Sequence, residues 1–165
     1  MLQPQLIKYS EYNLWANWKI SGYVLKAGDD VGDVVQPVSF PTIRKTLYHI
    51  WDAELIWYSR LNSLPAPKWP PSAEFAGNLV DAVAKILESS EKMTGFTSAC
   101  SEEKLDTMIS YTTSANKPYS SKISDVLMHC FNHSTYHRGQ IINMMRTAGF
   151  TDVGSTDYIS YCRMQ

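Results

Sequence analysis

The sequence lacks any apolar run close to the roughly 20 residues that a helix needs to cross a bilayer, so no membrane partner is expected. Its first residues, Met-Leu-Gln-Pro-Gln, lack the basic segment and apolar core that mark a secretory signal peptide. Cysteine is scarce: Cys100, Cys130 and Cys162 are an odd number with no CxxC spacing. These absences exclude a disulfide framework and a Cys₂His₂ zinc site, and they fit a cytoplasmic protein with reduced thiols.

An excess of one charge is also missing. The 15 Lys and Arg residues against 16 Asp and Glu residues give a net charge of −1, which argues against a nucleic-acid partner bound by bulk charge. With 44% hydrophobic and 19% charged residues, the composition is that of a globular protein. The 165 residues contain no internal repeat and no long linker, so a single domain over 1–165 is expected.

Several catalytic motifs are absent. There is no GxGxxG, no Walker loop and no nucleophile elbow. The HExxH motif of zincins is missing because Ser134 follows His133 and Cys130 follows His129. No acidic residue stands three positions before any histidine, which excludes the Glu-x-x-His motif of di-iron bundles. What remains for a metal is a mononuclear site made of imidazoles.

The histidines do form a pattern. His129, His133 and His137 are each four residues from the next, so on a helix they lie on one face. His49 lies in another amphipathic segment, and two ligands from one helix with one from another build a three-ligand metal site with open positions. A lone HxxxH pair is common by chance, but here the apolar stripe over 123–148 turns the pair inward, where an unpaired imidazole is costly. Spacing alone leaves the choice between the pairs 129/133 and 133/137 open.

Four long segments repeat apolar residues at the period of a helix. Their expected bounds are Leu2 or Gln5 to Ala27, Pro41 to about Leu64, Ser72 as N-cap to near Gly95, and Ser121 to Gly149. Four such helices favour an all-α four-helix bundle. The stretch Leu105–Tyr119, with a turn signal at 115–118, predicts a short β-hairpin or another extended excursion between the third and fourth long helices. The long connections 31–40 and 65–71 indicate a bundle other than the simplest up-down-up-down form, and a short helix is expected at Tyr158–Met164.

Some polar or small residues fall within these helices. Asn13 and Asn17 interrupt an apolar stripe, where they either line a polar pocket or form helix-to-helix hydrogen bonds. Asp52, three residues after His49, is expected to form an ion pair on the helix surface in preference to orienting the imidazole or reaching a metal. Gly139 in a helix interior indicates close packing of another helix.

Four segments match those of a known family. They are Asn13-Leu-Trp-Ala-Asn17, Leu47-Tyr-His-Ile-Trp-Asp-Ala-Glu54, Asn132-His-Ser-Thr-Tyr-His-Arg-Gly-Gln140, and Thr156-Asp-Tyr158 followed by Tyr161 and Arg163. The chain thereby resembles the DinB/YfiT-like superfamily of bacterial metal-binding four-helix bundles. The segments span most of the chain in the family's order, and His-x₃-His-Arg-Gly-Gln is the most specific of them.

The resemblance implies that one divalent metal ion, nickel or zinc, is held by one histidine of the second helix and two of the fourth. Carried over to this sequence, the ligands are His49, His133 and His137. His129 is then a neighbour on the pocket wall or a plain core residue. Cys130 is expected to be a buried, inert cysteine in preference to a zinc ligand. A homodimer is also expected by similarity.

The expected function rests on the same resemblance. Relatives in the wider superfamily include transferases and isomerases that use low-molecular-weight thiols such as bacillithiol, mycothiol or glutathione, and a metal with an open position lowers the pKa of a bound thiol. A metal-dependent thiol S-transferase with a deep pocket at the metal is therefore the first hypothesis. The alternatives are a metal-binding stress-response protein without turnover, which the lack of an evident general base favours, and a metal-dependent hydrolase. The residues expected to line the pocket are Tyr12, Asn13, Asn17, Trp57, His129, Cys130 and Arg138.

Overall fold

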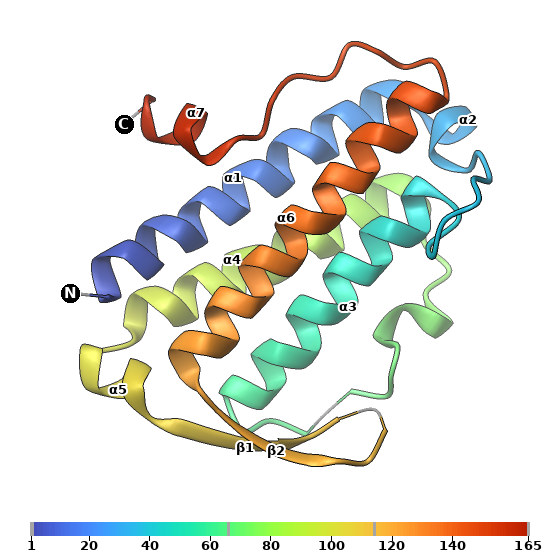
Figure 1. Ribbon diagram of the computed structural model, residues 1–165. Helices are drawn as coiled ribbons and strands as arrows, with labels where there is room; N and C mark the ends of the chain where they lie inside the picture. The colour runs from blue at the N-terminus through green and yellow to red at the C-terminus, as the bar shows by residue number, and fades with distance from the viewer. Residues whose placement is uncertain (1, 66, 114, 165) are drawn as a thin grey trace.

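Four long helices form a bundle in the computed structural model, which describes residues 2–65, 67–113 and 115–164 (Figure 1). The long helices are α1 (Gln3–Ala27), α3 (Ile43–Leu61), α4 (Leu79–Ala99) and α6 (Ile123–Thr147). The shorter elements are α2 (Asp29–Gly32), the 3₁₀ helix η1 (Pro71–Glu74), α5 (Glu102–Asp106), β1 (Met108–Thr112), β2 (Pro118–Lys122) and α7 (Tyr158–Cys162). The predicted all-α bundle with a short β-hairpin is therefore confirmed. Among the described helices, none combines the length and apolar character that crossing a membrane requires.

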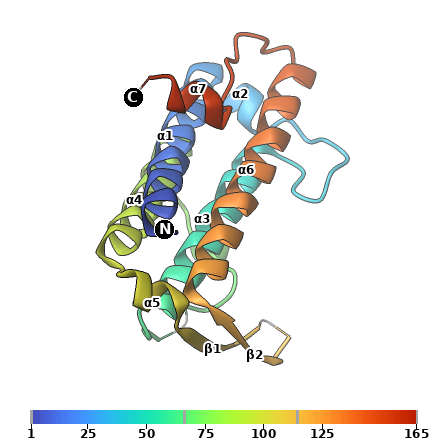
Figure 2. The same cartoon turned by 60° about the vertical axis from the view of Figure 1, so that its left-hand side comes forward.

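Two apolar clusters form the core, and their members show which way each helix runs. The first joins the later turns of α1 and α6 to the earlier turns of α3 and α4, through Ile20, Ile141, Leu47 and Val83 among others. The second joins the opposite ends of the same helices, through Leu6, Val126, Leu61 and Met93 among others. Helices α1 and α6 therefore run in one direction and α3 and α4 in the other, as Figures 1 and 2 show. Each long helix packs on two neighbours, in the ring order α1, α4, α3, α6.

The start of α4 differs from the expected one. The helix begins at a capping box, in which the side chains of Asn78 and Asp81 each accept a hydrogen bond from the other's backbone N–H. Ser72 lies in η1, and its N–H and hydroxyl donate to the carboxylate of Asp52 at 2.7 and 2.6 Å. The expected N-cap at Ser72 is therefore wrong, because its side chain is engaged by α3 while Asn78 satisfies the free N–H groups of α4.

The parallel course of α3 and α4 gives the segment 62–78 an unusual path. Since both helices run the same way, the described parts of this segment, 62–65 and 67–78, return along the length of the bundle before α4 begins (Figure 1). Asp52, which is 3% exposed, fastens it to α3 through Ser72. The surface ion pair expected for Asp52 is therefore wrong: its partner is the returning chain, which a helix-surface pattern does not show.

The β-hairpin leads directly into α6 and lies against the last turns of α3 (Figure 2). Its strands pair antiparallel, with Tyr111 opposite Tyr119. The ring of Trp57 meets the ring of Tyr111 edge-on, with 4.9 Å between centroids. The hairpin is displaced along the chain from its expected bounds because Leu105 is buried as part of α5 and the second strand continues to Lys122. Residue 114 of the predicted segment lies outside the described residues.

A layer of buried polar side chains separates the two apolar clusters. Each long helix contributes to this polar layer, which consists of Asn13, Asn17, Glu54, Ser89, Ser90, Ser134 and Arg138. The carboxylate of Glu54 accepts hydrogen bonds from Asn13 at 2.8 Å and from Ser89 and Ser90 at 2.7 Å each. Of the two interpretations of Asn13 and Asn17, the structure shows helix-to-helix hydrogen bonding.

Candidate metal centre

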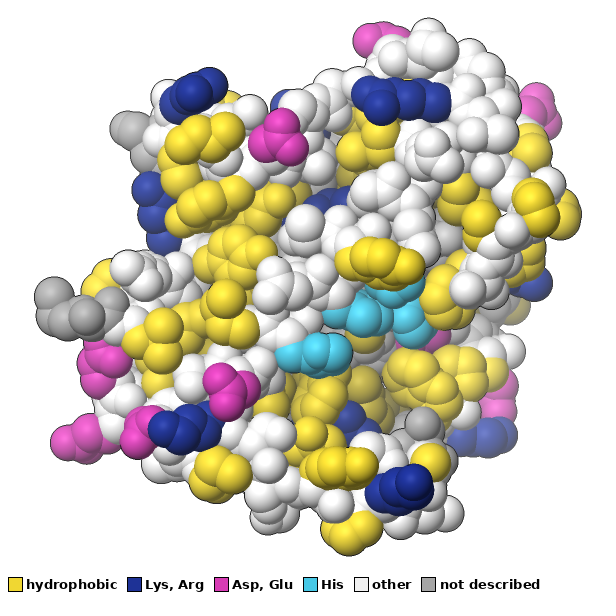
Figure 3. Space-filling model, in the orientation of Figure 1, with side chains coloured by type: hydrophobic (Ala, Val, Ile, Leu, Met, Phe, Trp, Pro, Cys, Tyr) yellow, Lys and Arg dark blue, Asp and Glu magenta, His cyan; other side chains and the backbone are white. Residues whose placement is uncertain are grey.

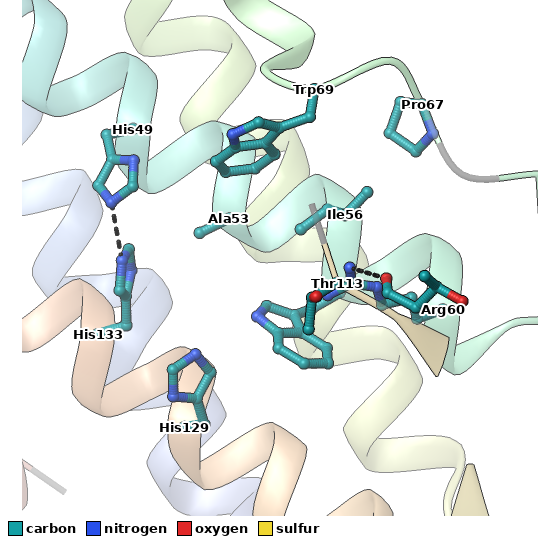
Figure 4. A pocket seen from close by; sticks show the side chains of 11 residues that line it. His49, Ala53, Ile56, Arg60, Pro67, Trp69, Thr113, His129 and His133 are labelled. Carbon is teal, nitrogen blue, oxygen red and sulfur yellow. Dashed lines mark hydrogen bonds between the residues drawn. The ribbon is translucent and has the colours of Figure 1, made fainter. Parts of the chain in front are cut away.

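Three imidazoles converge between α3 and α6. His49 comes from α3, and His133 and His137 come from successive turns of α6. The Nε2 atom of His133 lies 3.0 Å from Nε2 of His49 and 3.2 Å from Nε2 of His137. One ring nitrogen from each of the three lies within 4.8 Å of the other two. Figure 4 shows His49 and His133 pointing toward one another from their two helices.

Two of the three separations between these nitrogens match those of ligands around one ion. Two nitrogens at about 2.1 Å from a common zinc ion stand roughly 3.0 Å apart at a right angle and roughly 3.4 Å apart at the tetrahedral angle. The two Nε2 separations of 3.0 and 3.2 Å fall in this range. A set of imidazoles without a carboxylate suits zinc, copper, iron or nickel and not magnesium or calcium. The donor set is therefore positioned for a divalent transition metal.

Burial keeps these imidazoles neutral. It lowers the pKa of His133 to about 3 and that of His49 to about 4, with a smaller contribution from the neighbouring imidazoles. Burial also lowers the pKa of His137, against the hydrogen bond to Gln140, which raises it. Only a neutral imidazole offers a lone pair to a metal, so the environment keeps these donors available at neutral pH.

Neighbouring side chains fix the orientation of two of the rings. The Nδ1 atom of His137 lies 2.7 Å from the side-chain oxygen of Gln140, a geometry in which Nδ1–H donates and the lone pair is left on Nε2. The ring of Phe40 stacks on His49 with 4.0 Å between centroids and 21° between planes. The Nδ1 atom of His133 is buried and finds no hydrogen-bond partner among the described residues.

The polar layer fixes the rotation of the helix that carries two of the histidines. Arg138 follows His137 directly, is 1% exposed, and donates to the side-chain oxygens of Asn13 and Asn17 at 2.7 and 2.8 Å. Because successive residues point to different sides of a helix, holding Arg138 against α1 presents His137 to α3. Glu54, which anchors the layer, was not among the expected site residues. Its signal in the sequence is an acidic residue inside the largely apolar segment 43–61.

A cavity of about 460 Å³ opens beside His49 and His133. Its wall consists of His49, Ala53, Ile56, Trp57, Arg60, Pro67, Trp69, Thr112, Thr113, His129 and His133. In Figure 3 the histidines gather in the middle of this face of the molecule, next to apolar side chains. The volume is in the range of pockets that bind small molecules. The cavity thus has the position and the size that the enzyme hypothesis requires.

The structure separates the residues expected to line the pocket into two groups. Trp57 and His129 do line the cavity, and their rings meet edge-on with 5.4 Å between centroids. The described wall does not include Tyr12, Asn13, Asn17, Cys130 or Arg138. The two asparagines and Arg138 belong to the polar layer behind the site, so they support the histidines from the inside of the bundle.

Tyr12 and Cys130 lie elsewhere in the core. The hydroxyl of Tyr12 donates to the carbonyl of Thr156 at 2.9 Å, and its ring packs in an aromatic group that includes Trp15 and Tyr161. Cys130 is 1% exposed, and burial, together with the charge of Glu54, raises its pKa well above the ordinary value. A thiol in such surroundings stays protonated and inert.

Gly139 does not have the role that the sequence indicated. It is exposed, and a Cβ added to it would meet no atom within 4 Å. The expected close packing of another helix is therefore wrong within the described part of the chain, because this face of α6 points outward.

Phe40, Trp69 and Arg60 are among the site residues that the sequence does not indicate. Phe40 and Trp69 come from long connections, and no local pattern places a connection against a particular helix. Arg60 stands eleven residues after His49, on the same face of α3, and this spacing is the signal that could have found it.

The sequence comparisons agree with this architecture. The model of a family described as the DinB family matches residues 1–165. A protein of Bacillus subtilis (strain 168) named Protein DinB is 26% identical over 163 residues, which cover 95% of this chain and 93% of that protein.

Proposed function

The chain belongs to the DinB family, and from this premise we propose that it is a thiol S-transferase that uses one divalent metal ion, nickel or zinc. His49, His133 and His137 would hold the ion. The observation that carries the proposal is the convergence of these three imidazoles next to a cavity of about 460 Å³, whose wall includes His49 and His133, so that a substrate has room beside the ligands. A divalent ion held there would lower the pKa of a coordinating thiol, and the thiolate is the nucleophile.

Residues around the proposed metal site orient a ligand, form an apolar wall and provide a proton acceptor. Gln140 keeps the lone pair of His137 on Nε2. The apolar wall formed by Ile56, Trp57 and Trp69 excludes water from the substrate. His129 also lines the cavity, 5.9 Å from His133 between ring centroids, and burial lowers its pKa. In its neutral form a ring nitrogen of His129 can take the proton that an incoming thiol loses, which makes it the candidate general base.

A metal-dependent hydrolase has less support. Hydrolysis by a bound water usually relies on a carboxylate as general base, as the zincin glutamate shows. The described wall of the cavity contains no Asp or Glu. The remaining alternative is a metal-binding stress-response protein without turnover.

We also propose that the chain is a cytoplasmic homodimer. Large apolar side chains are exposed along α6 and α7, among them Met128, Tyr136 and Ile159. Exposed apolar side chains of this kind favour burial against a second copy. Sedimentation would show a dimer, and a monomer at micromolar concentration would contradict it. The cysteines are free thiols in the described structure, which suits a reducing compartment.

The test of the proposed function joins metal content to turnover. Tag-free protein and the His49→Ala variant are compared by elemental analysis and by transfer of glutathione, cysteine or bacillithiol to an activated aryl chloride. We expect about one metal per chain and measurable transfer in the wild-type protein, with both lost in the variant. Metal binding without transfer for every thiol would favour the protein without turnover.

A further inference from the structure

Arg60 lies in the cavity wall, near the end of α3, and its guanidinium group lies against two aromatic rings. The guanidinium carbon stands 4.5 Å from the ring centroid of Trp57 and 4.9 Å from that of Tyr111. One of its nitrogens, Nη2, donates to the backbone carbonyl of Thr112 at 2.8 Å. Figure 4 shows Arg60 on the far side of Ala53 and Ile56 from His49. These contacts with two rings and one carbonyl hold the guanidinium in place at the wall.

The cation of Arg60 has no anionic partner among the described residues. Its hydrogen bond goes to a neutral carbonyl, and the described wall of the cavity contains no carboxylate. Arg44 provides a contrast within the chain, because it pairs with both Asp29 and Asp33. A guanidinium has five N–H donors, so Arg60 keeps donors for a ligand. Leaving a partly buried cation unpaired is costly, and a bound anion would remove that cost.

The path from the histidines to Arg60 is apolar and long. His49, Ala53, Ile56 and Arg60 follow one another at spacings of four, three and four residues, so they form one line along α3. The backbone of α3 rises by about 16 Å along the helix axis over the eleven residues from His49 to Arg60. Trp57, Pro67 and Trp69 complete this part of the wall. A ligand that contacts both ends must therefore be elongated, with an apolar or neutral middle.

We propose that Arg60 binds the carboxylate of an elongated thiol substrate whose sulfur lies at the three histidines. The assignment of the sulfur end rests on the function proposed above, whereas the carboxylate end rests on Arg60 alone. The planar guanidinium offers two parallel N–H groups, which is the geometry that a carboxylate accepts. The spacing then excludes the shortest thiol acids, because a molecule that reaches the histidines through its sulfur leaves its carboxylate short of Arg60.

The carboxylate end is tested with metal-free protein and two probes of equal carbon number that differ in the end group, octanoate with an anionic carboxylate and 1-octanol with a neutral hydroxyl. Binding is followed by the fluorescence of the tryptophans and by calorimetry. We expect Arg60→Gln to lower the affinity for octanoate by about tenfold or more and to leave the affinity for octanol unchanged. Arg60→Lys keeps the positive charge but loses the two parallel N–H groups of the guanidinium. Its affinity for octanoate should lie between those of the wild type and Arg60→Gln. Arg146→Gln, which removes an exposed arginine outside the cavity wall, is the matched control and should bind both probes like the wild type.

Three outcomes would overturn the assignment of Arg60. They are the failure of octanoate to bind the wild-type protein, equal affinity of the wild type for octanoate and octanol, and equal weakening of both probes by Arg60→Gln. None of these depends on a metal, so they are independent of the thiol-transfer proposal.

The length of the ligand is tested with metal-loaded protein and unbranched ω-mercapto acids of two, six and eleven carbons. We expect the longer acids to bind more tightly, and Arg60→Gln to remove this preference. The affinity for the matching ω-mercapto alcohols should be the same in Arg60→Gln as in the wild type. If His49→Ala leaves the affinity for the mercapto acids unchanged while Arg60→Gln lowers it, the assignment of the sulfur to the histidines is wrong and the assignment of the carboxylate to Arg60 is supported. No dependence on length in the wild type would overturn the elongated substrate.

Discussion

Glu54 and Arg138 face each other across the centre of the bundle and are joined through the side-chain amides of Asn13 and Asn17. Each asparagine donates to Glu54 and accepts from Arg138, at distances between 2.7 and 3.2 Å. One carboxylate from α3 and one guanidinium from α6 are thus connected through α1. Because His49 and His137 belong to those same two helices, this connection fixes how their histidines meet.

The first prediction concerns this connection. Glu54→Leu should lower the free energy of unfolding by about 3–5 kcal/mol, because it leaves Arg138 buried without its countercharge. Urea denaturation of metal-free protein measures the change.

The double variant Glu54→Leu/Arg138→Met provides the control. We expect it to lose less free energy of unfolding than the sum of the two single variants, since neither charge is then left alone. Additive losses would show that the two side chains act independently.

The second prediction concerns which histidines bind the metal. His133→Ala and His137→Ala should each abolish tight metal binding, whereas His129→Ala should retain about one metal per chain, because only the first two contribute nitrogens to the group with His49. Metal analysis of the three purified variants measures this. Equal loss in all three would refute the assignment of ligands.

The third prediction concerns the orientation of His137. Gln140→Leu removes the acceptor of Nδ1–H and should weaken metal affinity by about 10- to 100-fold, the usual effect of losing the group that orients a ligand. Competition with a chelator measures the affinity. The matched control is Gln5→Leu, which changes an exposed glutamine of α1 and should leave the affinity as in the wild type. Unchanged affinity in Gln140→Leu would mean that the ring is oriented by its packing alone.

The fourth prediction concerns pH. In the folded, metal-free protein the pKa of His133 is lowered to about 3 and that of His49 to about 4, whereas an unfolded histidine has a pKa of about 6.5. Between pH of about 6.5 and about 4 the unfolded chain therefore binds protons that the folded chain does not. The free energy of unfolding should fall as pH decreases through this window and be restored as pH rises.

The variants His49→Gln and His133→Gln isolate that contribution from the rest of the titration. Denaturation of the metal-free proteins at several pH values should give a shallower slope for each variant than for the wild type. Parallel slopes would show that these imidazoles do not differ in proton affinity between the folded and unfolded states.

The sequence predicts the long helices well because each has an apolar stripe, and that signal is local. The i, i+4 spacing places His133 and His137 on one face, but selecting them over His129 needed the family resemblance. The sequence predicts Ser72 as the N-cap of α4, but the N-cap is Asn78, since Ser72 is held by Asp52 in another element.

The residues that the sequence did not reveal share one property: their partners are distant in the chain. Glu54 finds its donors on three other helices, and Asp52 finds Ser72 on a returning connection. Phe40 and Trp69 reach the site from connections whose paths depend on the direction of the helices. The periodicity of apolar residues predicts which side of a helix is buried. It contains no information about which residues of other elements pack against that side.

Because α3 and α4 run parallel, the site is formed by two kinds of segment, long helices and an irregular connection. The histidines stand on long helices that are fixed by the core, whereas Pro67 and Trp69 belong to the connection that must travel back along the bundle. Insertions and substitutions in such a connection change little buried area. Ligand preference can therefore diverge, or be exchanged by grafting this one connection, while the metal-binding scaffold is inherited unchanged.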